Sequence, residues 1–449
     1  MQVHNLRGSW LAQCSSSSTF SKQISRIANG GKTESSDRSM QSISDRMGFR
    51  QQPAPSRPDD FSAQEGKQCL ANPHNRKGEI LMLNRLLLTL TVAVFVPTAA
   101  TYAQDKQPIS GKTCDELLAQ YKQLPFTNIL PLDEGPVAIG GEEKKITIGF
   151  SQTAFNHPWR VSMLESLQAE ACRHPNVSLV VLDGNVDVAK QSNDVRDLLV
   201  RGVDAVLLSP VESAALVPAA RAVTDAGIPL IVMDRDVPAE KTLFIGQSNI
   251  TMAEQVAEKM AEDLGGKGNI VVLTGLKGSS PAVDRNKGME NVLAKYPDIK
   301  VLAVGDAQWI REPAVPLMED FLTAHSDIDA VFSHAEESSW GAQLAIARAN
   351  RCGDGIRHYT FDGSNAGFKA VKAGTFRADG NYTPFIADIG LRAALYKLSG
   401  KDIPGAESYD MPGSRLLLPD SPTVVAANAD EWIGRGWGDF EPTPDPCKK

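Results

Sequence analysis

Charged and aromatic side chains that could bind a polar ligand stand close behind the apolar runs of this 449-residue chain. Carboxylates accept hydrogen bonds from hydroxyl groups, guanidinium groups donate them in fixed forks, and indole rings cover the C–H face of a sugar ring. This set is typical of a site for a polyhydroxylated ligand. Its members are Phe155, Asn156, Trp159, Arg160, Asp234, Arg235, Arg285, Trp309, Glu336, Asp362 and Asn381.

Several of these residues also have a purely structural interpretation. Asp234 and Arg235 could form a surface ion pair at a turn. Arg160 and Arg285 stand at helix starts, where they could face water, and Trp309 could be part of a core. Three histidines lack metal-like spacing or a nucleophile partner and are interpreted as structural: His157, His334 and His358.

The elements that must position these side chains form two similar series. Apolar runs without polar alternation indicate strands buried on both faces, and the helices between them indicate right-handed crossovers in a parallel sheet. The chain is therefore predicted to form two consecutive doubly wound α/β lobes, each flavodoxin-like or Rossmann-like, with ligand residues at the carboxyl ends of the strands. The first series has strands at 146–150, 177–182, 204–209, 228–234 and 242–246; the second has strands at 269–275, 299–304, 329–333 and 357–363.

Composition excludes several classes of protein. Residues 104–449 hold 34 Lys and Arg against 47 Asp and Glu, a net charge of −13, so nucleic-acid binding is not expected. The chain has no GxSxG elbow, HExxH helix or Walker A run, and no base stands beside a nucleophile, so we expect neither an enzyme nor a cofactor or metal site. A repressor would need an N-terminal helix-turn-helix, which the Ser-rich start does not offer.

Residues 82–103 are predicted to be a Sec signal peptide. Arg85 precedes an apolar run over 86–96, and small residues then lead to a cleavage site after Ala103. The alternative is a membrane anchor, but the run is shorter than the roughly 20 residues that a span needs. Export would place the protein in the periplasm. The stretch 1–81 is Ser-rich and aperiodic; our hypothesis is that translation begins at Met82, the alternative being a disordered tail.

Six motifs in order resemble the type I periplasmic solute-binding proteins of ABC importers, in the ribose and galactose branch. The Trp-Arg of the first loop and the LLLPD tail are most similar to galactofuranose-binding proteins, and the match runs from about 144 to 420. The motifs are FSQTAFNHPWR, GVDAVLLSPV, IPLIVMDRDV, GSSPAVDRNKGM, FDG and SRLLLPD.

This resemblance implies an architecture and a function. It implies two lobes joined by three crossover strands, a monosaccharide or polyol held between them, and hinge closure presented to a membrane permease. We expect a monomer. The alternative is a sensory sugar-binding protein that feeds a chemoreceptor or sensor kinase. The expected boundaries are 104–143 for an extra N-terminal segment, 144–246 with 381–412 for the first lobe, and 247–380 with 413–449 for the second lobe and tail.

The resemblance also assigns ligand contacts, with two departures. Where the family reads Asn-Asp-Glu/Asp-Met, this chain has Ala335, Glu336, Glu337 and Ser338, and Asn381 replaces a Gln or Glu. A sugar hydroxyl aimed at the missing amide would be left unpaired, at a cost of about 1–3 kcal/mol. We therefore expect a deoxy sugar, a smaller polyol or a pose shifted towards Glu336. The contacts that carry over are Asn156, Trp159, Arg160, Asp234, Arg235, Arg285, Trp309, Asp362 and Asn381.

Four cysteines follow the expected signal peptide: Cys114, Cys172, Cys352 and Cys447. Four cysteines allow three pairings, and free buried thiols are a further alternative. The topology implied by the resemblance favours Cys114–Cys172 within the first lobe and Cys352–Cys447 within the second.

Overall fold

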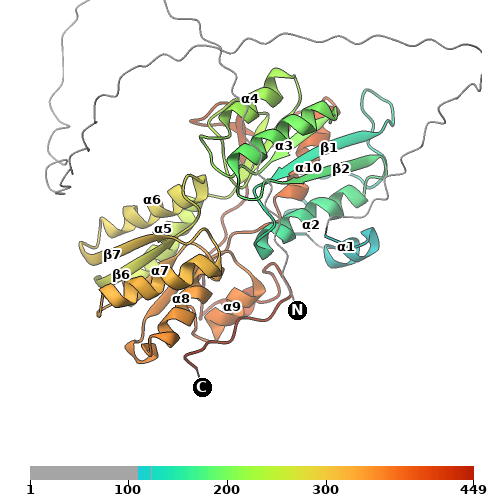
Figure 1. Cartoon of the computed structure of the whole chain (residues 1–449). Helices are drawn as coiled ribbons and strands as arrows, with labels where there is room; N and C mark the ends of the chain where they lie inside the picture. The colour runs from blue at the N-terminus through green and yellow to red at the C-terminus, as the bar shows by residue number, and fades with distance from the viewer. Residues whose placement is uncertain (1–109, 123, 449) are drawn as a thin grey trace, which may run out of the picture. The chain divides into compact units, whose positions relative to one another are not determined.

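The computed structural model describes residues 110–122 and 124–448. The expected signal peptide at 82–103 and the stretch 1–81 lie outside the described residues. The described part contains two largely parallel sheets with helices on their faces, as predicted (Figure 1). None of the helices within it is long and apolar enough to cross a membrane.

The first lobe is built on a seven-stranded sheet in the order β11-β12-β5-β4-β3-β1-β2, in which β11 alone runs antiparallel to its neighbour. Helices α2 and α10 contact each other over one face, and α3 and α4 lie together on the other (Figure 1). The strands are β1 (Ile146–Gln152), β2 (Val177–Asp183), β3 (Ala205–Leu208), β4 (Leu230–Met233), β5 (Leu243–Gly246), β11 (Glu407–Ser408) and β12 (Ser414–Leu417). The helices are α2 (Pro158–Cys172), α3 (Val188–Val200), α4 (Val217–Asp225) and α10 (Ala387–Leu398).

The second lobe is built on a six-stranded sheet in the order β13-β10-β9-β8-β6-β7. Helices α5 and α6 pack together, as do α7 and α8 (Figure 1). The strands are β6 (Lys267–Thr274), β7 (Asp298–Asp306), β8 (Ala330–Ser333), β9 (Arg357–Phe361), β10 (Ala378–Gly380) and β13 (Val424–Val425). The helices are α5 (Asn249–Asp263), α6 (Ser280–Leu293), α7 (Arg311–Ala324), α8 (Glu336–Arg348) and α9 (Asn365–Lys372).

The apolar strands form because both faces of each sheet are covered. In β6, Ile270 and Val272 pack into the core under α5 and α6, whereas Val271 and Leu273 pack into the core under α7 and α8. Successive side chains of a strand point to opposite faces, so a strand between two helical layers must be apolar at every position. This is why the continuous apolar runs predicted the strands correctly.

The chain passes between the two lobes three times, after β5, after β10 and after β12, as expected. Gln247 on the first crossover joins all three, because its Oε1 accepts from Thr383 N at 2.9 Å and its Nε2 donates to Pro419 O at 3.5 Å. The boundary expected between residues 412 and 413 is wrong. Strand β12 pairs with β5 of the first lobe, so the third crossover lies after Leu417.

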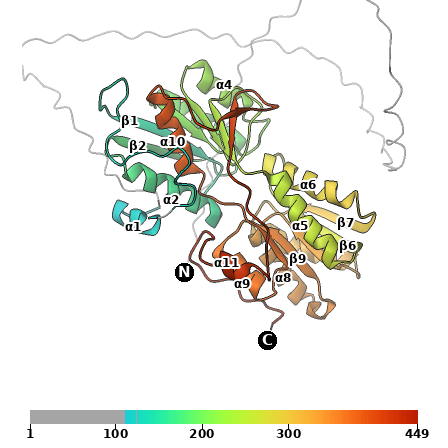
Figure 2. The ribbon, with the colours of Figure 1, turned by 180° about the vertical axis from the view of Figure 1, so that it is seen from behind.

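The terminal segments are each fastened to one lobe by a disulfide. Cys114–Cys172 joins α1 (Cys114–Gln120) to the end of α2, and Cys352–Cys447 joins the end of the chain to the second lobe. The predicted pairing is confirmed. Figure 2 shows α1 beside α2, and α11 (Ala429–Trp432) beside α9.

Candidate functional site

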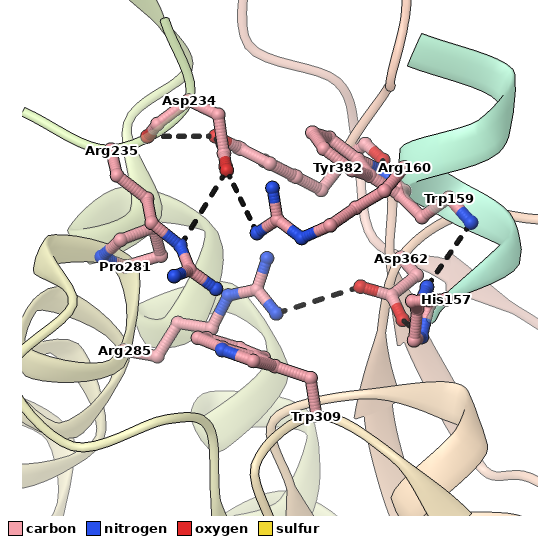
Figure 3. Close-up of a pocket in the computed structure, with 10 residues that line it drawn as sticks. All are labelled: His157, Trp159, Arg160, Asp234, Arg235, Pro281, Arg285, Trp309, Asp362 and Tyr382. Carbon is pink, nitrogen blue, oxygen red and sulfur yellow. Dashed lines mark hydrogen bonds and ion pairs between the residues drawn. The ribbon is translucent and has the colours of Figure 1, made fainter. Parts of the chain in front are cut away.

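A narrow pocket lies between the carboxyl ends of strands from both lobes (Figure 3). Its cavity volume is about 30 Å³, room for one or two water molecules. A larger ligand therefore requires the lining side chains or the lobes to move. The lining residues are His157, Trp159, Arg160, Asp234 and Arg235 from the first lobe, Pro281, Arg285, Trp309 and Asp362 from the second, and Tyr382 from the second crossover.

The start of α2 brings three residues to the pocket. Pro158 occupies the first turn, where its missing N–H costs nothing, and His157 is the N-cap, whose Nδ1 accepts from Trp159 N at 3.1 Å. Trp159 Nε1 donates to Tyr382 O at 3.1 Å, and the two rings stack with centroids 5.5 Å apart. An indole of the first lobe is thus fixed against the crossover.

Asp234 and Arg235 follow β4 and are buried, so they are not a surface ion pair. The Asp234 carboxylate accepts from Arg160 Nη2 at 3.2 Å and from Tyr382 Oη at 3.0 Å. Arg235 Nη1 donates to the carbonyl of Val211 at 2.9 Å. Asp234 has a φ of +66°, which is uncommon for a residue other than glycine and points to a constrained turn.

Arg285 on α6 is buried and does not face water. Its Nε donates to Asn249 Oδ1 at 2.9 Å, and its Nη1 donates to the carbonyl of His334. The guanidinium lies between aromatic rings, 5.2 Å from the centroid of Trp309 and 5.1 Å from that of Tyr382. Trp309 is therefore a wall of the pocket and not plain core.

Asp362 follows β9 and completes the pocket. Its Oδ1 lies 3.7 Å from Arg285 Nη1, and its Oδ2 accepts from Glu336 N at 3.3 Å. Burial raises the pKa of Asp362 well above its ordinary value, and the Arg285 guanidinium opposes that rise. A ligand that donates a hydroxyl hydrogen bond to this carboxylate would favour its charged form.

The site offers buried donors that have no partner. Burial, and then the neighbouring arginines, lower the pKa of His157 to about 3, so its ring is neutral. Since Nδ1 accepts from Trp159 N, the proton is on Nε2, 4.0 Å from Asp362 Oδ2. His157 Nε2, Arg235 Nε and Trp309 Nε1 are buried without a hydrogen-bond partner in the described part of the chain. Such donors suit a ligand rich in acceptor oxygens.

The pocket contains seven of the eleven predicted residues. Asn156 is exposed and lines a small adjoining cavity that shares Arg160, Arg235 and Trp309 with the pocket. Phe155 packs against the core beside it. Asn381 is buried but lines a separate cavity of about 630 Å³. Glu336 lies in the first turn of α8, and its carboxyl accepts from Ser364 N at 2.8 Å, away from the pocket.

Three lining residues were not predicted. His157 was assigned a structural role because its spacing indicates no metal, yet as the N-cap of α2 it lies in the pocket wall. Tyr382 stands two residues after β10 (Ala378–Gly380), a short strand that was not among the predicted strands, so the strand-end rule did not reach it. Pro281 carries no polar side-chain group. The sequence signal that could have identified Tyr382 is the YTPF run at 382–385, which places an aromatic residue at the start of the second crossover.

This geometry defines a class of protein: two α/β lobes, three crossovers, and a polar, aromatic-walled pocket to which both lobes contribute. In the described residues, no cluster of three or more His, Cys, Asp or Glu could hold a metal ion. Residues 148–402 match the family described as a periplasmic binding protein domain, and the chain belongs to that family. Its members are binding proteins rather than enzymes.

Related proteins are named for sugars and polyols. A xylitol-binding protein of Mycolicibacterium smegmatis is 35% identical over 240 residues, covering 53% of this chain and 68% of the relative. A galactofuranose-binding protein of Escherichia coli is 29% identical over 286 residues, covering 62% and 89%. The solved fructose-binding periplasmic domain of a hybrid two-component system superposes with a TM-score of 0.59 at 31% identity, covering 65% and 94%.

Proposed function

We propose that this protein is the periplasmic binding component of an ABC importer for a monosaccharide or polyol, without enzymatic activity of its own. The observation that carries the proposal is the pocket itself. Two carboxylates, three guanidinium groups and two indoles converge there from both lobes. The relatives named for xylitol and galactofuranose support the same class of ligand.

Closure of the lobes would couple binding to transport. A ligand in the pocket contacts residues of both lobes only when they are closed, so its binding free energy shifts the open–closed equilibrium by its differential affinity for the closed form. A permease can then distinguish loaded from unloaded protein. The protein would act as a monomer in the periplasm.

The ligand is proposed to be small. Ala335 replaces the amide of the family pattern and is buried, and Glu336 points to Ser364, so neither supplies a polar contact to the pocket. The pose shifted towards Glu336 is therefore disfavoured. The loss of that amide favours a polyol or a sugar with few hydroxyl groups at that end.

A sensory role is the second candidate. The structural neighbour that is part of a hybrid two-component system has 31% identity to this chain. The fold and pocket would serve either role, and the partner would differ. Capture of a permease by the loaded full-length chain in membranes from the source cell favours import; capture of a sensor kinase favours signalling.

The ligand class is tested by thermal unfolding of the full-length chain with D-ribose, D-galactose, D-fructose, xylitol and glycerol, and with amino acids as a solute-class control. A true ligand at 100 times its dissociation constant adds about 2.7 kcal/mol of stability. We expect at least one sugar or polyol to raise the midpoint, and Asp234→Asn to abolish the shift. Stabilisation by amino acids alone would refute the proposal.

A further inference from the structure

The turn that carries Asp362 is strained. Asp362 has a φ of +134° and the following Gly363 a φ of +77°. A residue with a side chain rarely adopts such a φ, and it persists there only when surrounding contacts hold it. The position of the Asp362 carboxylate in the pocket therefore depends on what fixes residues 362–364.

Part of that support comes from the C-terminal tail, defined as residues 433–448, which lies beyond the residues 148–402 that match the family. Trp437 is buried, and its indole Nε1 donates to the carbonyl of Asp362 at 2.8 Å. Its main chain brackets the turn as well, since Trp437 N donates to Gly363 O at 3.3 Å and Asn365 N donates to Trp437 O at 3.0 Å.

Hydrogen bonds from the Asn365 side chain fix the tail around Trp437. The Asn365 side chain donates to the carbonyls of Gly436 and Gly438, both at 3.0 Å, and accepts from Gly434 N at 2.8 Å. A Cβ at Gly436 would lie 2.7 Å from both Asn365 N and Gly363 O, so only glycine allows this approach. The disulfide from Cys447 fastens the end of the tail to the second lobe.

We propose that the C-terminal tail is a working part of the ligand site, with Trp437 as the positioning residue that holds the Asp362 turn in its binding conformation. The inference rests on the proposed function, because it assigns a role to a segment acting on that pocket. Trp437 does not line the pocket and acts only through Asp362.

The test is calorimetric titration of Trp437→Phe with whichever of D-ribose, D-galactose, D-fructose, xylitol and glycerol binds the unaltered chain most tightly. Phenylalanine keeps an aromatic ring against Phe440, which now contacts Trp437 with centroids 5.5 Å apart, and removes the N–H donor. We expect an affinity loss of about fivefold, the loss that one neutral hydrogen bond predicts. Trp432→Phe, on the same side of the second lobe but packed on Phe368, is the matched control and should bind normally.

A double-mutant cycle separates positioning from general destabilisation. If Trp437 acts through Asp362, Trp437→Phe should change affinity less than twofold in an Asp362→Asn background. Additive losses, or unchanged affinity in Trp437→Phe, would overturn the inference while leaving the proposed function intact. If Trp437→Phe does not fold, Gly436→Ala, which pushes the tail from the turn, takes its place with the same expected outcomes. An unaltered chain that binds amino acids and none of the five compounds refutes both proposals.

Discussion

At the scale of single residues, the pocket keeps its charges in place before any ligand arrives. The Asp234 carboxylate is bound by Arg160 and Tyr382, and Arg285 is bound by Asn249 and a main-chain carbonyl. Buried polar groups that are already oriented lose little conformational freedom on binding, so more of each new contact remains as affinity. The conformational entropy of these side chains is lost when the protein folds and not when the ligand binds.

Arg285→Lys should lower ligand affinity at least tenfold. A lysine ammonium cannot reproduce both the Nε bond to Asn249 and the Nη1 bond to His334, nor the flat contact with Trp309. Isothermal titration measures the loss. Arg392→Lys is the control, because Arg392 is buried in the first lobe beside Glu170, outside the pocket; it should reduce stability without reducing affinity. Equal affinity loss in both variants would contradict a specific role for Arg285.

Two buried carboxyl groups behind the pocket predict a pH-dependent stability. Burial and the nearby Asp379 raise the pKa of Glu336, and burial raises the pKa of Asp379 to about 7. Glu336 Oε1 and Asp379 Oδ2 both lie against Gly367, and Asp379 Oδ2 has no donor among the described groups unless one carboxyl keeps its proton. The folded protein therefore holds a proton that the unfolded chain, with an Asp pKa near 3.8, releases earlier.

The sign of the effect follows from proton linkage. Because this pair keeps its proton to a higher pH in the folded state than in the unfolded chain, its contribution to the free energy of unfolding should fall as pH rises from about 4 towards neutrality. Asp379→Asn should flatten the fall, which is on the order of a few kcal/mol. Urea unfolding at pH 4.5, 6 and 7.5 measures the free energy of unfolding of the unaltered protein and of Asp379→Asn. If the two free energies change in parallel with pH, Glu336 and Asp379 do not share a proton.

At the scale of elements, the sequence indicated the strands and helices well because burial on both faces leaves a simple pattern. The sequence did not predict features that depend on tertiary contacts. Helix α8 begins at Glu336, and its first turn carries the Glu336 side chain towards Ser364, which the sequence did not indicate. Strand β12 falls wholly within the range 413–449 expected for the second lobe, but it pairs with β5 of the first lobe, a contact that the local sequence does not reveal. Tyr382 was missed because the three-residue strand β10 before it is too short to leave a clear apolar run.

The crossovers predict a hinge effect at Gln247. Gln247→Ala removes the side chain that joins the first crossover to Thr383 and Pro419, so the closed arrangement loses an internal tie. We expect a larger radius of gyration in ligand-free protein by small-angle scattering and an affinity lower by about threefold to tenfold. Gln343→Ala on α8, a buried glutamine away from the crossovers, is the control. Identical scattering from Gln247→Ala and the unaltered protein would show that the Gln247 hydrogen bonds do not stabilise the closed arrangement.

At the scale of the described molecule, each disulfide is confined to one lobe, so neither opposes movement of the lobes. Cys114–Cys172 closes a sequence separation of 58 residues and Cys352–Cys447 one of 95. Loop-closure entropy grows only with the logarithm of length, so the two bonds should stabilise the fold by similar amounts, about 4 kcal/mol each in the chain-entropy treatment. The two disulfides should thus stabilise the fold similarly, but only Cys352–Cys447 fastens a segment that contacts the Asp362 turn of the pocket.

This difference predicts that only one of the two paired serine variants loses ligand affinity. Cys114→Ser with Cys172→Ser frees a segment that supplies no residue to the pocket, so stability should fall and affinity should not. Cys352→Ser with Cys447→Ser frees the end of the tail that holds the Asp362 turn, so stability should fall by a similar amount and affinity should fall about twofold to fivefold. Urea unfolding and titration calorimetry on both variants provide the comparison. Equal affinities would mean that noncovalent contacts, such as those of Trp437 and of Arg311 with Thr443, keep the tail in place, and that the disulfide acts on the fold and not on the site.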